Sequence, residues 1–244
     1  SSNTYFFWLM DQMSTKRSID RWYELASDFG LGQPVDIDLP YETRGILPDS
    51  TYLNKVLGEN KWGIGDLMSL GIGQGFLAAS PLQMALVSAI IANGGYYVQP
   101  HLVQSIRQND GTVLMTSPLK KKIEWIDRSK LAVVREGMRR VVTSGSGRYY
   151  ANLDSIKVAG KTGTSQNPHG RDHGWFISFA PLDDPKIAVV VFMENAGYAS
   201  ISAAPVASLL IEQYLTGEID RPYVYDYVKK FESRPTRTEQ TGGG

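Results

Sequence analysis

The chain has 244 residues, of which 42% are hydrophobic, so it is long enough to bury a sizeable core. Its 25 basic and 25 acidic residues balance, which gives neither the basic surplus of a nucleic-acid-binding protein nor an acidic tail for a cationic partner. The longest apolar stretch, from Met84 to Ala92, is too short to cross a bilayer.

Helical spacing of apolar residues and capping residues predict several helices. The first is expected to be buried together with its aromatic side chains, Tyr5 to Trp8. A Gly-, Pro- and Asp-rich segment over 31–61 predicts a long ordered loop. A later helix should begin with a capping box between Ser80 and Gln83. The predicted helices cover 4–13, 18–29, 80–92, a segment that starts at 127, and 203–215.

Apolar segments between turn residues predict the strands. A hairpin is predicted over 96–115, with its turn at Asn109-Asp110-Gly111. Residues 144–147, rich in serine and glycine, predict a flexible loop. Three further strands with short links predict an antiparallel meander over 156–165, 173–180 and 186–194.

The end of the chain has two parts. The helix over 203–215 is expected to cover the meander with Val206, Leu209, Leu210 and Tyr214. After Gly217 the composition becomes polar and charged. Residues 1–217 are therefore assigned to one domain, and residues 218–244 to a polar tail that is partly disordered.

The most informative motif is Lys161–Thr164, at the end of the first strand of the meander. Side chains alternate along a strand, so Lys161 and Gly163 should share one face. A cation, hydroxyl groups and glycines on one strand suit the binding of an anionic, peptide-like substrate. The alternative for this motif taken alone is an ordinary strand that ends in a turn.

Further motifs agree with Lys161–Thr164. Ser1-Ser2-Asn3 resembles the Ser-x-Asn motif of penicillin-binding proteins, and Lys161–Thr164 resembles their Lys-Thr-Gly strand. The glycine-rich segment 71–75 and the helix start at Ser80 resemble class B members, and the segments 166–171 and 176–181 resemble the elongation-type penicillin-binding protein 2 group. The resemblance implies an α/β (α+β) fold of the transpeptidase and β-lactamase type, an antiparallel sheet flanked by helices beside an all-helical subdomain. Only its later part would be present here.

The resemblance also implies catalytic roles for three residues. Ser1 would be a proton-relay hydroxyl beside the nucleophile. Asn3 would orient the substrate amide and the active-site lysine. Lys161 would supply positive charge to the relay and to the substrate carboxylate.

Three residues of the same strand would bind the substrate or a β-lactam. Thr162 and Thr164 would hydrogen-bond the substrate carboxylate, with Gly163 between them. The backbone N–H of Thr164 would form half of the oxyanion hole.

The family's Ser-x-x-Lys nucleophile motif is expected upstream of Ser1. The match at Ser117–Lys120 is rejected, because it follows a hairpin and stands between the other two motifs. His169 and His173 are four residues apart, but they lie in a hairpin loop without an obvious third ligand, so no metal site is predicted.

The resemblance implies a serine-type peptidoglycan D,D-transpeptidase that cross-links D-Ala-D-Ala stem peptides during cell elongation and is the target of β-lactams. It implies a place at the periplasmic face of the bacterial inner membrane, a membrane glycosyltransferase of the SEDS family as partner, and no metal or organic cofactor. This chain alone would be inactive. The alternatives are a β-lactamase or carboxypeptidase and a catalytically dead penicillin-binding or sensor domain, and the presence of an upstream Ser-x-x-Lys would discriminate them.

Overall fold

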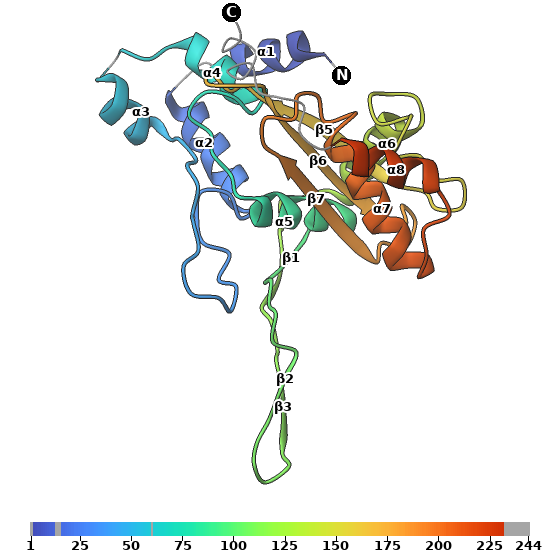
Figure 1. Ribbon diagram of the computed structural model, residues 1–244. Helices are drawn as coiled ribbons and strands as arrows, with labels where there is room; N and C mark the ends of the chain where they lie inside the picture. Colours follow the sequence, from blue (N-terminus) through green and yellow to red (C-terminus); the bar gives the residue numbers. More distant parts are fainter. Residues whose placement is uncertain (1, 13–15, 60, 232–244) are drawn as a thin grey trace, which may run out of the picture. The chain divides into compact units, whose positions relative to one another are not determined.

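The computed structural model describes residues 2–12, 16–59 and 61–231 (Figure 1). The chain divides into two compact units. The first unit consists of Ser1–Leu86 and Tyr97–Ile123, and the second of Val87–Tyr96 and Glu124–Gly244.

The first unit is mainly helical. Its small core gathers one or two apolar residues from each of the first four helices, namely Met10, Ile19, Leu53, Leu67 and Leu70. Packing of α1 on α4 and of α2 on α3 brings these residues together. The helices are α1 (Asn3–Gln12), α2 (Lys16–Ser27), α3 (Ser50–Leu57), α4 (Ile64–Gly71) and the first half of α5 (Pro81–Ala92).

Helix α1 forms where the sequence predicts a helix, but the prediction that its aromatic side chains are buried is wrong. Tyr5, Phe6 and Trp8 are 56%, 43% and 55% exposed. Met10 is the buried residue of this helix. Apolar residues surround α1 on all sides, whereas only one side can face α4, so the remaining side chains are left exposed.

The sequence predicts a loop over the whole segment 31–61. This prediction is wrong in part, because α3 lies within the segment. The Asp49 side chain caps this helix by accepting a hydrogen bond from the Tyr52 N–H at 2.6 Å. Leu53 anchors the helix in the core. Helix α4 is a further short helix that the sequence pattern does not predict.

The remaining loop is held by the buried side chain of Gln83. The predicted capping box is confirmed, since Ser80 N–H donates to Gln83 Oε1 at 2.9 Å and Gln83 N–H donates to Ser80 Oγ at 3.2 Å. Gln83 Nε2 also donates to the carbonyl oxygens of Gly30, Gln33 and Arg44, at 3.1, 3.0 and 2.9 Å. One amide group thus joins three separate points of the loop to α5.

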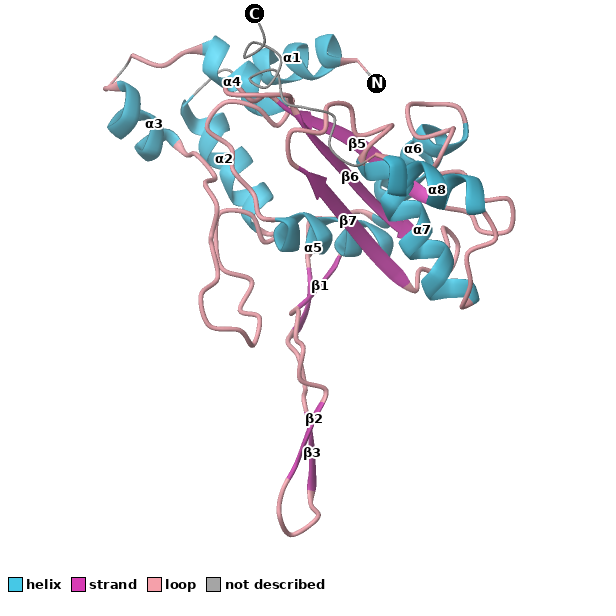
Figure 2. Cartoon of the chain, in the orientation of Figure 1, coloured by secondary structure: helices cyan, strands magenta, loops and turns pink. Residues whose placement is uncertain are grey.

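The predicted hairpin is confirmed at its turn end, where β2 (Ser105–Arg107) pairs with β3 (Val113–Met115) (Figure 2). Its base differs from the prediction, because β1 (Tyr96–Val98) is a separate strand that pairs with β4 (Lys120–Lys122), beyond the predicted end at 115. Its turn uses the predicted residues. Gly111 has φ +90°, a conformation that favours glycine, and Asp110 accepts a hydrogen bond from the Thr112 N–H at 2.8 Å.

The second unit is built on a three-stranded antiparallel sheet. The strand order is β5 (Ala159–Ser165), β6 (His173–Ala180) and β7 (Ile187–Met193). The register places Thr162 opposite Phe176, and Phe176 opposite Val191. The predicted meander is therefore confirmed.

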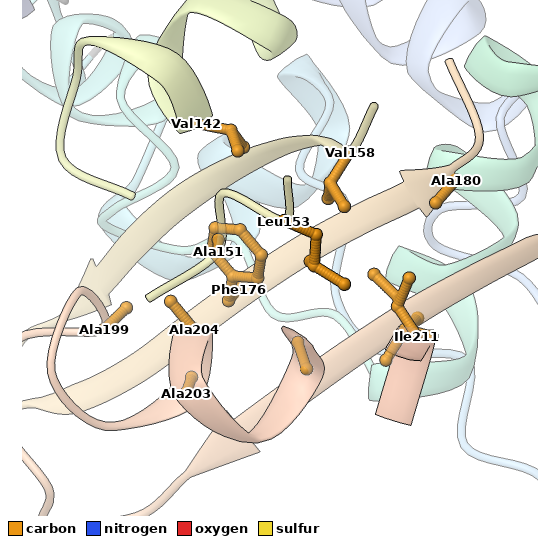
Figure 3. Close-up of a cluster of buried hydrophobic side chains, with 12 residues drawn as sticks. Val142, Ala151, Leu153, Val158, Phe176, Ala180, Ala199, Ala203, Ala204 and Ile211 are labelled. Atoms are coloured by element: carbon orange, nitrogen blue, oxygen red, sulfur yellow. The ribbon is translucent and has the colours of Figure 1, made fainter. Parts of the chain in front are cut away.

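Helix α7 (Ala203–Thr216) covers one face of this sheet around the buried Phe176 (Figure 3). Of the predicted covering residues Leu209 is buried, but Leu210 and Tyr214 are 50% and 64% exposed. Small residues contact the sheet instead, such as Ala204 and Ala207. Their size lets the helix approach the strands closely, which a pattern of large apolar residues does not reveal.

The second cluster of the unit joins β5 and β6 to two helices. Ala159 and Phe179, opposite each other in the sheet, pack with Ala92 of α5 and Met138 of α6 (Arg128–Thr143). Both helices therefore fix the beginning of β5, the strand that carries Lys161.

Within the segment 218–244, expected to be a polar tail, residues Pro222–Lys230 form α8. Just before α8, Arg221 forms a nearly buried ion pair with Glu212 of α7 at 3.0 Å, the two side chains being 13% and 6% exposed. Tyr227 of α8 donates a hydrogen bond to the Ile201 carbonyl at 2.8 Å. The rest of the expected tail, residues 232–244, lies outside the described residues.

Candidate active site

Strand β5 lies at an edge of the three-stranded sheet, and no strand pairs with its outer side in the described part of the chain. An edge strand can take up an extended peptide through its backbone. The motif Lys161–Thr164 occupies the middle of this strand. The location suits a substrate that is itself a short peptide.

At two positions of β5, the close approach of β6 requires glycine. A Cβ atom on Gly160 would lie 2.5 Å from Phe176 Cζ and 3.0 Å from the Ile177 carbonyl oxygen. A Cβ atom on Gly163 would lie 3.2 Å from Trp175 Cβ. The strand can therefore lie close against β6 only because these positions lack side chains.

The strand register assigns the motif's side chains to two faces. Lys161 lies opposite Ile177 and Gly163 opposite Trp175, so Lys161 and Gly163 share a face, as predicted. Thr162 lies opposite Phe176, on the other face. The site therefore presents its cation and its first hydroxyl group from opposite sides of the strand.

Lys161 lies in surroundings that disfavour its charge. Burial lowers the pKa of its ammonium group, although the residue as a whole keeps exposed surface. Lys161 Nζ donates a hydrogen bond to the Thr162 carbonyl at 2.5 Å. No salt bridge of Lys161 to a carboxylate occurs among the described residues. The group is a cation that an anionic ligand would stabilise.

Thr162 has a partner that the sequence pattern does not reveal. Its Oγ1 lies 2.7 Å from Ser146 Oγ, at hydrogen-bond distance. The segment 144–147, predicted as a flexible loop, is a turn that hydrogen-bonds to the last residues of α6. Gly145 N–H donates to the Arg140 carbonyl and Gly147 N–H to the Val141 carbonyl, both at 2.9 Å. A serine between two glycines gives no sequence signal for this contact.

The Ser-x-Asn motif falls in the first unit. Asn3 is the first residue of α1, and Ser1 lies outside the described residues. The glycine-rich segment 71–75 supports this helix, because a Cβ atom on Gly71 would lie 2.4 Å from Met10 Cγ and 3.2 Å from the Phe6 carbonyl oxygen. Close contact between α1 and α4 therefore requires Gly71.

Two other sequence matches do not belong to these motifs. Ser117 is exposed and lies between β3 and β4, not on a helix. This agrees with the prediction that Ser117 follows a hairpin. His173 begins β6, and its Nδ1 accepts a hydrogen bond from the Asn195 N–H at 3.0 Å. Among the described residues there is no group of three or more His, Cys, Asp or Glu side chains that could hold a metal ion.

Over the described ranges, none of the helices combines the length and the apolar character needed to cross a membrane.

Comparison with known proteins gives a family for the chain. Residues 1–212 match the model of the penicillin-binding protein transpeptidase domain. The chain is 34% identical, over all of its length, to the peptidoglycan D,D-transpeptidase MrdA of Haemophilus influenzae. It covers 39% of that relative, so it spans about two fifths of the length of such a protein.

Solved structures agree with this assignment. Penicillin-binding protein 2 of Pseudomonas aeruginosa, in complex with WCK 5153, matches with a TM-score of 0.75 and 33% identity, over 91% of this chain and 49% of that one. A structure described as a peptidoglycan synthase complex that coordinates polymerization and crosslinking matches with a TM-score of 0.75 and 28% identity, over 89% of this chain and 37% of that one. The predicted fold and resemblance are confirmed, and the chain belongs to the penicillin-binding protein transpeptidase family, with penicillin-binding protein 2 as its relatives.

Proposed function

We propose that this chain is the later part of a serine peptidoglycan D,D-transpeptidase that cross-links D-Ala-D-Ala stem peptides during cell elongation and is acylated by β-lactams. The observation that carries the proposal is β5. It places an unneutralised lysine, two threonines and the required glycines on an edge strand, in a chain of the transpeptidase family.

Strand β5 would bind the end of the stem peptide. The substrate's terminal carboxylate would accept hydrogen bonds from Thr162 and Thr164, with Lys161 supplying positive charge. Gly163 would let the peptide approach the backbone closely. The Ser146 hydroxyl, 2.7 Å from Thr162 Oγ1, would fix the direction of the Thr162 hydroxyl.

The chemistry requires a nucleophile that would precede this chain. A serine Oγ would attack the carbonyl carbon of the penultimate D-Ala, and the terminal D-Ala would leave as a free amino acid. An amine of a second stem peptide would then attack the acyl-serine and release the enzyme. The Thr164 backbone N–H would stabilise the oxyanion in both steps.

Ser1 and Asn3 would serve the proton transfers of these steps. Ser1 would relay a proton beside the nucleophile, and Asn3 would orient the substrate amide and the active-site lysine. The lowered pKa of Lys161 supports a part in the same relay, because a desolvated lysine gives up its proton more readily.

A partner and a location follow from the relatives. The matching synthase complex is described as coordinating polymerization with crosslinking, which supports a polymerizing partner such as a SEDS-family membrane glycosyltransferase. The substrate lies in the cell wall, so the active site would stand on the periplasmic face of the inner membrane. The function needs no metal or organic cofactor.

The proposal is tested by incubating both the longer protein and this chain with a fluorescent penicillin. The longer protein should become covalently labelled on a serine upstream of Ser1, and this chain alone should stay unlabelled. Absence of labelling in the longer protein, or labelling on Ser117, would contradict the proposal.

A further inference from the structure

The second unit contains a pocket that the proposed acyl transfer does not use. Its volume is about 650 Å³, within the usual range of small-molecule sites. It is formed by the end of α5, one face of α6 and the β6–β7 turn. Its polar lining includes Arg128 and Arg135 of α6 and Asp183 and Asp184 of the turn.

The carboxylates that line the pocket are already paired with cations from outside it. Asp183 pairs with Lys157 at 2.8 Å and Asp184 with Lys186 at 2.6 Å. The third carboxylate, Glu136, pairs with Arg140 of its own helix at 3.0 Å. None of these three cations lines the pocket. Each carboxylate of the lining therefore has a cationic partner of its own, in a surface ion pair.

The hydrogen-bond acceptors that the two arginines of the lining contact in the described part of the chain are neutral. Arg128 donates to the Tyr96 hydroxyl at 3.3 Å, and its guanidinium lies 5.8 Å from the centre of that ring. Arg135 donates to the Leu182 carbonyl and lies 5.5 Å from the centre of the Phe179 ring. Neither arginine forms a salt bridge with a carboxylate over the ranges that the structure describes.

A guanidinium group has more N–H donors than these contacts use, so both arginines can bind an anion in addition. Arg135 also acts on Asp183. The hydrogen bond and charge of Lys157 are the largest causes of the lowered pKa of Asp183, and the charge of Arg135 is the smallest. That order indicates that Lys157, and not Arg135, is the main partner of Asp183.

The spacing of the arginines suggests the shape of a ligand. Arg128 and Arg135 are seven residues apart on α6, which places them on the same face and about 10 Å apart along the axis. Leu131 and Ala132 line the pocket between them. The α6 wall thus presents a cation, an apolar surface and a second cation in a row.

We propose that this pocket binds a small molecule with two carboxylate groups joined by an apolar linker. Each carboxylate would take hydrogen bonds from one guanidinium, and the linker would cover Leu131 and Ala132. Such a site would be separate from β5 and would bind a ligand without covalent chemistry.

The proposal can be tested by isothermal titration calorimetry with azelate, a linear molecule that carries a carboxylate at each end. Azelate should bind the wild-type protein. Arg128→Ala should weaken binding roughly tenfold or more, because a hydrogen bond to a charged group is lost. Nonanoate, which lacks the second carboxylate, should bind more weakly than azelate by a similar factor.

Lys130→Ala is the matched control, since it removes one positive charge from the same helix but from outside the pocket lining. Its azelate affinity should equal that of the wild type. Circular dichroism should show that both variants are folded. Absence of azelate binding to the wild type, or equal weakening by Arg128→Ala and Lys130→Ala, would overturn the proposal.

Discussion

The sheet of the second unit and the long loop of the first unit are stabilised in different ways. Apolar side chains pack on the strands in two clusters, one around Phe176 and one around Phe179, so many small contacts share the stabilisation. In the loop after α2, one side chain, Gln83, holds three carbonyl groups. We therefore expect that changing the shape of one apolar side chain in the sheet lowers the stability only a little, whereas removing the Gln83 amide group lowers it strongly.

The largest expected effect is that of Gln83→Leu. Leucine nearly fills the same space but leaves the carbonyl groups of Gly30, Gln33 and Arg44 without their donor. The bond to Gly30 is buried and the other two are part-buried. The variant loses both N–H groups of Gln83 Nε2, and an acceptor without a partner costs about 1–3 kcal/mol, so the free energy of unfolding of the first unit should fall by about 4 kcal/mol. Urea denaturation measures this loss.

Gln104→Leu is the control for that experiment, because Gln104 lies exposed near β2. It should change the free energy of unfolding by less than about 0.5 kcal/mol. If Gln83→Leu costs no more than Gln104→Leu, the loop does not depend on the buried amide.

A smaller effect is expected from Phe176→Leu in the sheet. The new residue is again leucine, but here an apolar side chain replaces another, and the surrounding side chains can partly fill the space. The free energy of unfolding should fall by about 1–2 kcal/mol, well below the loss for Gln83→Leu. The same denaturation measurement gives the comparison, and a larger loss at Phe176 than at Gln83 would reverse it.

The smallest effect concerns the pH dependence of the loop. Asp38 accepts hydrogen bonds from the N–H groups of Leu102 and Val103, both at 2.7 Å. These bonds lower its pKa below 3.8, with that from Val103 the largest cause. Since the folded state favours the charged carboxylate, this contribution is complete above pH 3.8 and is lost as the pH falls through the lowered folded pKa.

Amide hydrogen exchange at Leu102 and Val103 measures that loss, after correction for the intrinsic pH dependence of exchange. Their protection should fall in acid in the wild type, and Asp38→Asn should remove the pH dependence. Unchanged protection of these amides across the same acid range would show that the Asp38 carboxylate does not hold them.

The same contrast explains how far the sequence predicts the structure. The strands around Phe176 and the motif Lys161–Thr164 were predictable, because apolar periodicity and a local motif both lie along the chain. The contact of Ser146 with Thr162 was not, because it joins residues that only the fold brings together. Helix α3 was missed since its signal is one capping residue, Asp49.

Exposure was the hardest property to predict. Tyr5 and Trp8 are large aromatic residues of the kind found in protein cores, but both are more than half exposed. A helix that is apolar on all sides can pack against its neighbour on one side only. In the opposite sense, small residues such as Ala204 and Ala207 of α7 are fully buried. Burial depends on which side of an element finds a partner, and this is decided by tertiary packing.

The central claim, that β5 is the substrate-binding strand of a transpeptidase, is tested most directly by the rate of acylation of the longer protein by a fluorescent penicillin. Lys161→Ala should slow acylation by about 100- to 1,000-fold, because it removes a preorganised charge at the reacting group. Lys157→Ala, a surface lysine paired with Asp183, should leave the rate unchanged. Equal rates in wild type and Lys161→Ala would contradict the role of β5.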